Sequence, residues 1–198
     1  MSIDRTAAAN AIDAFLRAIG RDPAKEPELV GTGARVADAY VDELCSGYAV
    51  DTRALLQGAV IAAPAAADGG QLVIVRDVPI TTMCPHHLLP ASGTATIAMQ
   101  TIDRLVGLGT LAALVEAHAR RLTLQEQIGE SVVADIAAVL APEWAGCKIV
   151  LAHGCMLARG ERAHGSSVET VALRGIAGDQ LTRTSRQERA HRALGMGQ

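Results

Sequence analysis

The stretch QLVIVRDVPITTMCPHH, residues 71–87, joins a strand pattern to a candidate metal site. Residues 71–78 are rich in Val and Ile, which is typical of a β-strand. Cys84 and His87 follow in C-x-x-H spacing, in which a thiolate and an imidazole can converge on one zinc ion. Pro85 between them stiffens the loop. An isolated C-x-x-H is equally compatible with a core cysteine beside a surface histidine, because short motifs carry a high false-positive risk.

A second element, HGC at residues 153–155, strengthens the metal interpretation. It ends a strand predicted over 147–153, where it can meet the first loop. Together the two elements supply Cys84, His87 and Cys155. Three protein ligands with one open position are typical of a catalytic zinc site, whereas structural sites usually close with four.

Two histidines remain beside these candidate ligands. His86 and His153 are free to move protons, which a pKa near neutrality makes possible. A zinc-bound water of lowered pKa together with two imidazoles is the equipment of metal-assisted hydrolysis. If either histidine were instead a fourth ligand, the site would be structural.

From residue 57 onward the elements run in the order strands, two helices, strands. This order predicts an antiparallel α+β unit with both helices on one face of the sheet. Its open edges are liabilities unless paired, which favours subunits joining edge to edge into a barrel. We expect helices over 7–19, 32–47, 106–121 and 124–140, strands over 57–63, 71–78, 93–100, 147–153 and 166–174, and a turn over 66–70. The corresponding regions are an N-terminal helical region at 1–50, a zinc-binding catalytic domain at 51–177 and a polar tail, helical or loose, at 178–198.

The composition narrows the classes of function. Aromatic residues make up 2% of the 198, so the core is aliphatic and offers few rings for base stacking. A net charge of -3 without a basic block argues against a nucleic-acid partner. No apolar run is long enough for a membrane span, and Asp4 and Asp13 interrupt the apolar positions that a signal peptide needs. We expect a cytoplasmic protein with reduced cysteines, among which Cys45 and Cys147 are small buried residues.

Gln125 and Glu126 begin the helix predicted over 124–140. A carboxylate beside an amide can accept from and donate to the edge of a guanine-like ring. Taken alone, a glutamate there is more simply explained by the favourable helix dipole. Arg159 can clamp an anion or merely form a surface ion pair.

Taken together, these motifs resemble the GTP cyclohydrolase I family, which has the tunnelling fold. The similarity covers about residues 30–176. The family's Cys-Glu-His-His stands here as CPHH at 84–87, and its His-x-Cys-x-x-x-Arg-Gly as HGCMLARG at 153–160. Its Gln-Glu pair stands as Gln125-Glu126.

The resemblance implies a reaction and an assembly. Hydrolysis opens the imidazole ring of GTP at C8, formate leaves, the ribose rearranges and a new ring closes to dihydroneopterin triphosphate. The family forms a homodecamer with sites between subunits. The implied roles are zinc ligation by Cys84, His87 and Cys155, proton transfer by His86 and His153, and purine binding by Gln125 and Glu126.

Several positions depart from the family pattern. Where the family's Thr-Pro-x-Arg-x-x-Lys has its lysine, this chain has Asp38. In the family's Gly-Leu-Ser-Lys-x-x-Arg the serine, lysine and arginine are replaced by Gly109, Thr110 and Ala113. Pro85 replaces the glutamate of Cys-Glu-His-His.

The basic cradle for a triphosphate is thereby reduced to Arg159 and Arg35. Charge-assisted contacts contribute roughly 1.5–3 kcal/mol each, so losing three cations weakens triphosphate binding by several kcal/mol. Two alternatives to GTP hydrolysis follow. One is a cyclohydrolase for a purine or related heterocycle without a triphosphate. The other, from a different class, is a non-catalytic zinc protein that binds a pterin or a partner protein.

Overall fold

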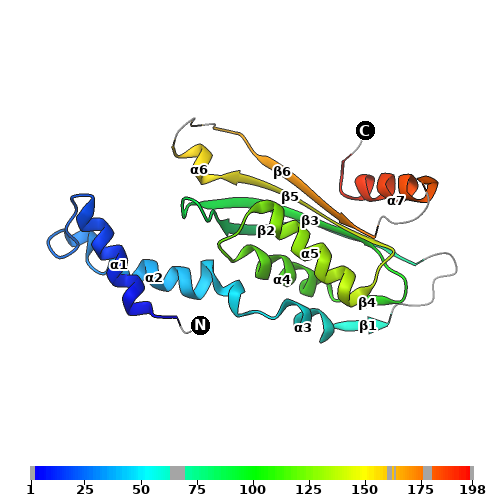
Figure 1. The fold of residues 1–198 in the computed structure, drawn as a ribbon, viewed down its shortest axis with the longest axis horizontal. Coiled ribbons are helices and arrows are strands. Elements are labelled where there is room, and N and C mark those ends of the chain that lie inside the picture. Colours follow the sequence, from blue (N-terminus) through cyan, green and yellow to red (C-terminus); the bar gives the residue numbers. More distant parts are fainter. Residues whose placement is uncertain (1–2, 63–69, 160–161, 163, 176–179, 197–198) are drawn as a thin grey trace.

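The computed structural model describes residues 3–62, 70–159, 162, 164–175 and 180–196. Figure 1 shows two parts, a body built around a β-sheet and a helical arm that carries the N-terminal segment away from it. The arm holds α1 (Arg5–Ala18) and α2 (Thr32–Asp38). The candidate metal residues lie at the end of the sheet nearest the arm.

The body contains a four-stranded antiparallel sheet, which confirms the predicted α+β class. Its strand order is β2-β3-β5-β6, so β2 and β6 are the edge strands. Edge strand β2 is longer than the strand predicted over 71–78. It continues to residue 83, past a register shift between Val75 and Val78. The bounds are β2 Leu72–Met83, β3 Pro90–Gln100, β5 Trp144–His153 and β6 Val168–Arg174.

Two helices, α4 (Leu108–Ala119) and α5 (Gln125–Leu140), pack side by side on one face of this sheet (Figure 1). The core between them is aliphatic, as the composition predicted. Removing such side chains from water is the main favourable term in folding. Its fully buried members include Ile97, Leu111, Leu114, Ile128, Ile136 and Ile149.

Both long helices lie on one face of the sheet as predicted, and the opposite face is also partly covered. Helix α7 (Gln180–Ala193) lies there, and Ala190 and Leu194 pack against Trp144 and Ala98. The tail is therefore a docked helix. Its sequence is polar apart from a few small or apolar positions, so the pattern alone was too weak to indicate which face it would cover.

The arm is held together by both packing and charge. Helix α2 continues directly into a π-helical turn, η2 (Ala39–Leu44). Arg5 of α1 donates to Asp38 at 3.0 Å and also pairs with Asp42. Asp38, which stands where the family pattern has a phosphate-contacting lysine, is thus occupied by an ion pair within the arm.

Shorter elements complete the chain. Two three-residue strands pair with each other, β1 (Val60–Ala62) with β4 (Arg104–Val106). The strand expected over 57–63 was too long, because α3 (Thr52–Gln57) occupies its start. The remaining short helices are η1 Pro27–Leu29, η3 Ser46–Ala49 and α6 Gly154–Leu157.

Parts of some expectations lie outside the described residues. These are position 63 of that strand, most of the turn at 66–70, Gly160 of the HGCMLARG motif and the 177/178 boundary between the domain and the tail.

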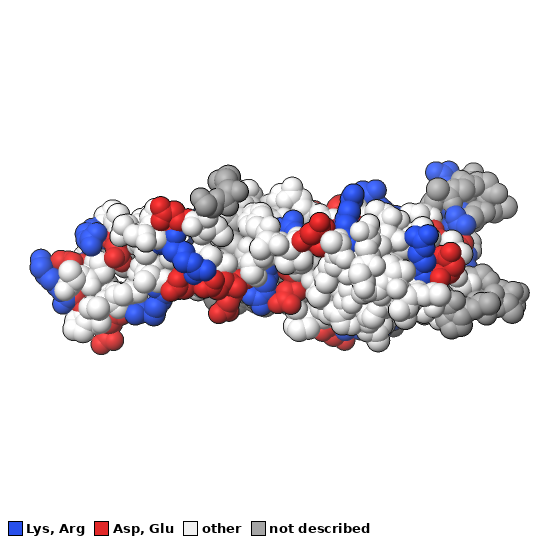
Figure 2. Space-filling model, turned by 90° about the horizontal axis from the view of Figure 1, so that it is seen from below, with Lys and Arg blue, Asp and Glu red and all other residues white. Residues whose placement is uncertain are grey.

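No helix in the described ranges is both long and apolar enough to cross a bilayer. On the face drawn in Figure 2, acidic and basic side chains are interspersed along the arm. All four cysteines are free. Cys147 is buried as expected, and burial raises the pKa of its thiol to about 12. Cys45 is only half-buried, because it lies in the thin arm where less chain is available to cover it.

Candidate metal centre and adjoining cavity

The loop that follows β2 is fixed by backbone hydrogen bonds. The Cys84 N–H donates to the Leu89 carbonyl and the Leu88 N–H donates to the Cys84 carbonyl, both at 2.9 Å. Leu88 has a φ of 52°, which is a left-handed backbone conformation. Residues other than glycine adopt it mainly where the surrounding structure enforces it. The Tyr40 hydroxyl, from π-helical η2, donates to the Leu88 carbonyl at 3.0 Å. The arm therefore helps to shape the loop.

The sheet register brings the second element to this loop. Ala91 at the start of β3 pairs with His153 at the end of β5. The next residue, Gly154, passes so close to β3 that an added Cβ would lie 2.7 Å from the Pro90 carbonyl oxygen. Glycine is needed for this approach, which delivers Cys155 to the loop.

Three donor atoms converge there. The sulfur atoms of Cys84 and Cys155 and a ring nitrogen of His87 all lie within 4.8 Å of one another. The Cys84 Sγ to His87 Nδ1 distance is 3.6 Å. Within the described part of the chain this is the one cluster of His, Cys, Asp and Glu donors that could hold a metal ion.

The chemistry of this donor set fits a metal. Desolvation and the negative charge of Cys84 raise the pKa of the Cys155 thiol, since two adjacent thiolates repel each other. A divalent cation between the two sulfurs removes that repulsion and favours both thiolates. The geometry and the donor chemistry of the cluster therefore fit a divalent metal ion.

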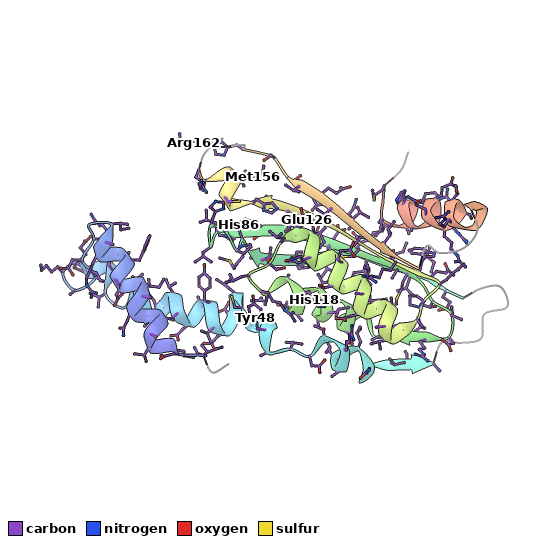
Figure 3. All side chains as sticks on the ribbon, viewed as in Figure 1. Tyr48, His86, His118, Glu126, Met156 and Arg162 are labelled. Carbon is purple, nitrogen blue, oxygen red and sulfur yellow. The ribbon has the colours of Figure 1, made fainter. Side chains whose placement is uncertain are left out.

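A cavity of about 230 Å³ adjoins the three donors. Its walls come from the loop after β2, the end of β5 with α6, and the first turn of α5. His86 and Glu126 are exposed at its walls, and Figure 3 shows both at the same end of the sheet, together with Met156. The His86 ring stands nearly perpendicular to the His87 ring, with centroids 6.1 Å apart.

His153 and Gln125 also line the cavity, and they contact each other. The distance from His153 Nε2 to Gln125 Oε1 is 2.7 Å. Gln125 is only 3% exposed, and its amide nitrogen bonds to groups of β5 and β6. Glu126 is thus the more accessible member of the Gln-Glu pair.

The two arginines expected at the substrate are not among the residues that line the cavity. Arg159 is exposed just beyond α6, and its charge lowers the pKa of Cys155 against three larger causes that raise it. Arg35 donates to the Val30 carbonyl at 2.8 Å and to the Thr32 hydroxyl at 2.9 Å, both within the arm. Among the residues the structure describes, no lysine or arginine lines the cavity.

Comparison with known proteins now identifies the family. The sequence profile described as GTP cyclohydrolase I matches residues 8–191. The chain belongs to the GTP cyclohydrolase I family. One relative, GTP cyclohydrolase 1 of Leptospira biflexa serovar Patoc, is 35% identical over 167 residues, which are 84% of this chain and 88% of the relative. Another, GTP cyclohydrolase 1 of Deinococcus radiodurans, is 36% identical over 162 residues, which are 82% and 72% of the two chains.

A solved structure, the archaeosine synthase QueF-Like in its apo form, aligns with a TM-score of 0.42 and 15% identity over 52% of this chain and 93% of its own.

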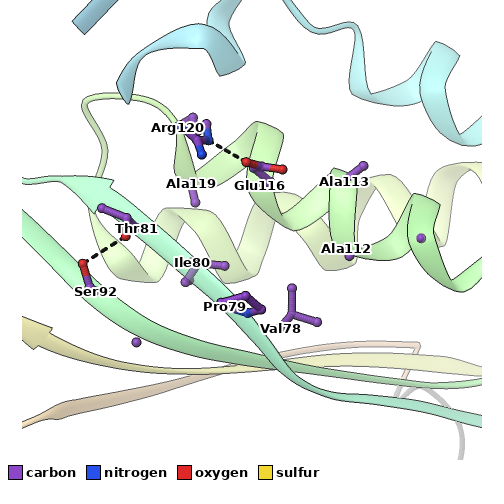
Figure 4. Close-up of a pocket in the computed structure, with 12 residues that line it drawn as sticks. Val78, Pro79, Ile80, Thr81, Ser92, Ala112, Ala113, Glu116, Ala119 and Arg120 are labelled. Atoms are coloured by element: carbon purple, nitrogen blue, oxygen red, sulfur yellow. Dashed lines mark hydrogen bonds and ion pairs between the residues drawn. The ribbon is translucent and has the colours of Figure 1, made fainter. Parts of the chain in front are cut away.

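Two of the positions that depart from the GTP cyclohydrolase I pattern lie in a second hollow. Gly109 and Ala113 of α4 line a groove of about 610 Å³ against the edge strand β2 (Figure 4). The charged residues lining this groove are Glu116 and Arg120, which pair with each other at 2.7 Å. The remaining wall is formed by small, apolar or hydroxyl-bearing side chains.

Sequence reasoning missed two features of the structure. Tyr40 lies within the helix predicted over 32–47, and its position there gave no sign of a bond to the metal loop. A buried cluster also joins α4 and α5 beneath the sheet. There His118 Nε2 lies 2.9 Å from an Asp135 carboxylate oxygen, and Thr52 and Arg53 of α3 bond to the same carboxylate.

Proposed function

We propose that this chain is a zinc-dependent cyclohydrolase that opens the imidazole ring of a guanine-type purine and releases formate. One observation carries the proposal, namely that the Cys84, His87 and Cys155 donors share a cavity with His86, His153 and Glu126. Three metal donors leave a coordination position open, and acid–base groups stand beside it. Membership of the GTP cyclohydrolase I family supports the same reaction.

The metal is proposed to be zinc, because two thiolates and one imidazole suit that ion. When bound, zinc supplies a water whose pKa is lowered toward neutrality, and hence a nucleophile. Cys84, His87 and Cys155 would hold it. Four-coordinate zinc would keep one position open, since His86 and His153 stand outside the cluster that the structure forms.

Proton transfer is the task of the two remaining histidines. Releasing the ring carbon as formate requires two C–N bonds to be cleaved by two waters. In each cleavage a water loses a proton and the departing nitrogen gains one. His86 and His153, which line the cavity, are placed to accept and return these protons.

Substrate recognition is proposed to rest on the start of α5. Glu126 presents a carboxylate to the cavity, and a carboxylate can accept two N–H bonds from the edge of a guanine. Gln125 is its neighbour in the family motif, but its amide is already bonded to β5, to β6 and to His153. Arg159 is proposed to contact an anionic part of the substrate from the rim, and Arg35 to do so only if a neighbouring subunit brings the arm to the cavity.

A second candidate substrate is a purine or related heterocycle without a triphosphate. The specific observation in its favour is that no cation among the described residues lines the cavity, while Asp38 and Arg35 are engaged within the arm. GTP carries about four negative charges, which such walls do not neutralise. If GTP is the substrate, the product is dihydroneopterin triphosphate.

The assembly is proposed to be a homo-oligomer in which edge strands β2 and β6 join between subunits into a barrel, a decamer by family resemblance. Within the described part of the chain, each of these strands has a neighbouring strand on one side only. Analytical ultracentrifugation measures the mass directly, and a monomer would contradict this part of the proposal. We also propose a cytoplasmic location and three regions, with limits 1–50, 51–177 and 178–198.

The decisive assay is formate release from GTP, GMP, guanosine and free guanine by the metal-reconstituted protein. The proposed function requires turnover of at least one of them and its loss on chelation of the metal. Preference for guanosine or GMP supports the second candidate, and fastest turnover of GTP with micromolar affinity removes it. A metal-containing protein that binds pterins tightly but releases no formate from any of these would instead be a non-catalytic relative.

A further inference from the structure

Gln125 is almost wholly enclosed, and each part of its amide has a partner in the protein. The amide nitrogen lies 3.0 Å from the Ile149 carbonyl oxygen, 2.9 Å from the Val168 carbonyl oxygen and 3.1 Å from the Thr170 hydroxyl. The amide oxygen lies 2.7 Å from His153 Nε2. The side chain thus spans from strands β5 and β6 to the candidate acid–base group.

These partners fix the orientation of the amide. Backbone carbonyl oxygens can only accept hydrogen bonds, so the NH₂ group must face Ile149 and Val168. In the reversed orientation, the amide oxygen of Gln125 would face these two backbone carbonyl oxygens. Neither carbonyl would then receive a hydrogen bond from the amide. The amide oxygen of Gln125 therefore faces His153.

The orientation of the amide in turn fixes the tautomer of the histidine. An amide oxygen only accepts, so the short contact requires His153 Nε2 to carry a hydrogen and to donate it. In a neutral imidazole the other nitrogen, Nδ1, then bears the lone pair. Within the described part of the chain Nδ1 has no hydrogen-bond partner, and His153 lines the cavity.

We propose that Gln125 is a positioning residue, which holds His153 as the Nε2–H tautomer and leaves Nδ1 as the acceptor available to the substrate. This inference rests on the proposed function of His153 and deepens it. It assigns Gln125 to the histidine and leaves recognition of the ring edge to Glu126. Gln125 is held by backbone carbonyls of strands β5 and β6. The orientation of the His153 ring is therefore fixed by the rigid sheet and not by a loop.

The proposal differs from direct purine binding by Gln125 in what a substitution changes. A residue that binds substrate alike in the ground state and the transition state affects KM, whereas one that orients an acid–base group affects kcat. Gln125→Met keeps the length of the side chain and removes both the acceptor and the donors. Gln127→Met is the matched control two positions on, since Gln127 is exposed on the same helical turn and has no contact with His153.

The experiment compares these variants with the wild type in the metal-reconstituted full chain. It measures metal content, thermal unfolding, kcat and KM for formate release, and the ring ¹⁵N resonances of histidine-labelled protein by solid-state NMR. The chain has 6 histidines, and the His153 signals are assigned by their loss in His153→Asn. Protonated and unprotonated ring nitrogens are well separated, so the tautomer is read directly.

We expect wild-type His153 to show a protonated Nε2 and an unprotonated Nδ1. In Gln125→Met we expect a mixture of tautomers and a kcat lower by roughly 10- to 100-fold, the range found when a group that orients a functional histidine is removed. KM and metal content should stay within about twofold. Gln127→Met loses capping bonds at the start of α5, so its unfolding temperature should fall, but it should match the wild type in metal content, kcat, KM and ¹⁵N spectrum.

A protonated Nδ1 in the wild type, or a Gln125→Met variant whose KM rises at constant kcat, would overturn the proposal. If Gln125→Met does not fold, Thr170→Val removes one anchor at the half-buried sheet edge and should give a smaller fall in kcat with the same tautomer mixing. If no formate is released even by the wild type, the proposed function fails, while the ¹⁵N spectrum still decides whether Gln125 sets the tautomer.

Discussion

Two hollows of this molecule lie along the same sheet and differ in chemistry. The cavity at the end of the sheet holds thiols, imidazoles and a carboxylate within about 230 Å³. The groove along the β2 edge is larger, about 610 Å³, and its charged lining is one internal ion pair, Glu116 with Arg120. Groups suited to bond cleavage are thus gathered in the first hollow, and groups suited to holding phosphates are scarce in both.

This difference between the hollows separates ring-opening chemistry from phosphate binding within one chain. The metal donors come from a single loop and a single strand end, so the sheet register assembles them without help from another subunit. Anion binding needs cations directed at the ligand. Here Arg35 bonds to the Val30 carbonyl and Asp38 pairs with Arg5, so both side chains make contacts within the arm. The chemistry of ring opening and the choice of substrate are therefore expected to respond to different substitutions.

The largest expected effect is the loss of a metal ligand. Cys155→Ser should abolish metal binding and lower formate release by more than about 1,000-fold, because a neutral hydroxyl replaces a thiolate. Metal content by mass spectrometry and turnover are measured together. Cys45→Ser, which alters a half-buried cysteine of the arm, is the control and should keep both. Equal losses in the two variants would show that cysteine removal acts through the fold.

A smaller effect is expected from charging the groove. Thr110→Lys combined with Ala113→Arg restores the two cations of the family pattern on α4. We expect kcat/KM for GTP relative to guanosine to rise about tenfold at low salt, and the gain to shrink in 0.5 M salt because exposed charges are screened. Thr110→Gln with Ala113→Gln controls for side-chain size. An unchanged ratio would mean that the groove does not face the substrate's phosphates in the assembled protein.

The contact between the arm and the loop should have a moderate effect. Tyr40→Phe removes the hydroxyl that bonds to the Leu88 carbonyl, so the strained loop is held less firmly. Metal affinity, measured by competition with a chromophoric chelator, should fall several-fold. Tyr48→Phe removes a hydroxyl that bonds only to the Leu122 backbone and should leave the affinity unchanged. Identical metal affinities in the wild type, Tyr40→Phe and Tyr48→Phe would show that the arm does not influence the metal site.

The smallest effect concerns the buried pair of His118 and Asp135, which joins α4 to α5. Burial lowers the pKa of His118, with the bond to Asp135 opposing this shift. The unfolded chain therefore takes up the proton at a higher pH than the folded chain, and stability falls as the pH drops below about 6.5. We therefore expect the wild type to lose stability through this group as the pH falls from 7 to 5.

His118→Gln keeps a donor for Asp135 without titrating, so its stability should depend less on pH over that interval. Denaturant unfolding at the two pH values gives the difference between the proteins. A parallel decline in both would show that His118 does not contribute. Metal content should be the same in both proteins, since His118 lies outside the cluster of donors.

Much of this architecture could be predicted from local patterns. Val- and Ile-rich runs indicated the strands, long amphipathic segments indicated α4 and α5, and C-x-x-H with HGC indicated that Cys84, His87 and Cys155 would converge. Their donor atoms do lie within 4.8 Å of one another. These features succeed because each depends on spacing within a few residues, together with one sheet register.

Other features depend on contacts between distant segments and left no local pattern. The bond from Tyr40 to Leu88 joins residues far apart in sequence, and Gln125 reaches strands β5 and β6 only after folding. The docking of α7 on the second face rests on a few small or apolar residues in a polar segment. Propensity and periodicity do not encode such partners, because packing decides them.

The central claim is that the three donors form a catalytic site with His153 as an acid–base group beside it. His153→Ala tests it most directly, with metal content and formate release measured on the same preparation. We predict that the metal is retained at the wild-type level while formate release falls by roughly 10²- to 10⁴-fold. Loss of the metal together with the fold would mean that His153 is a structural ligand, and unchanged formate release would mean that it takes no part in the reaction.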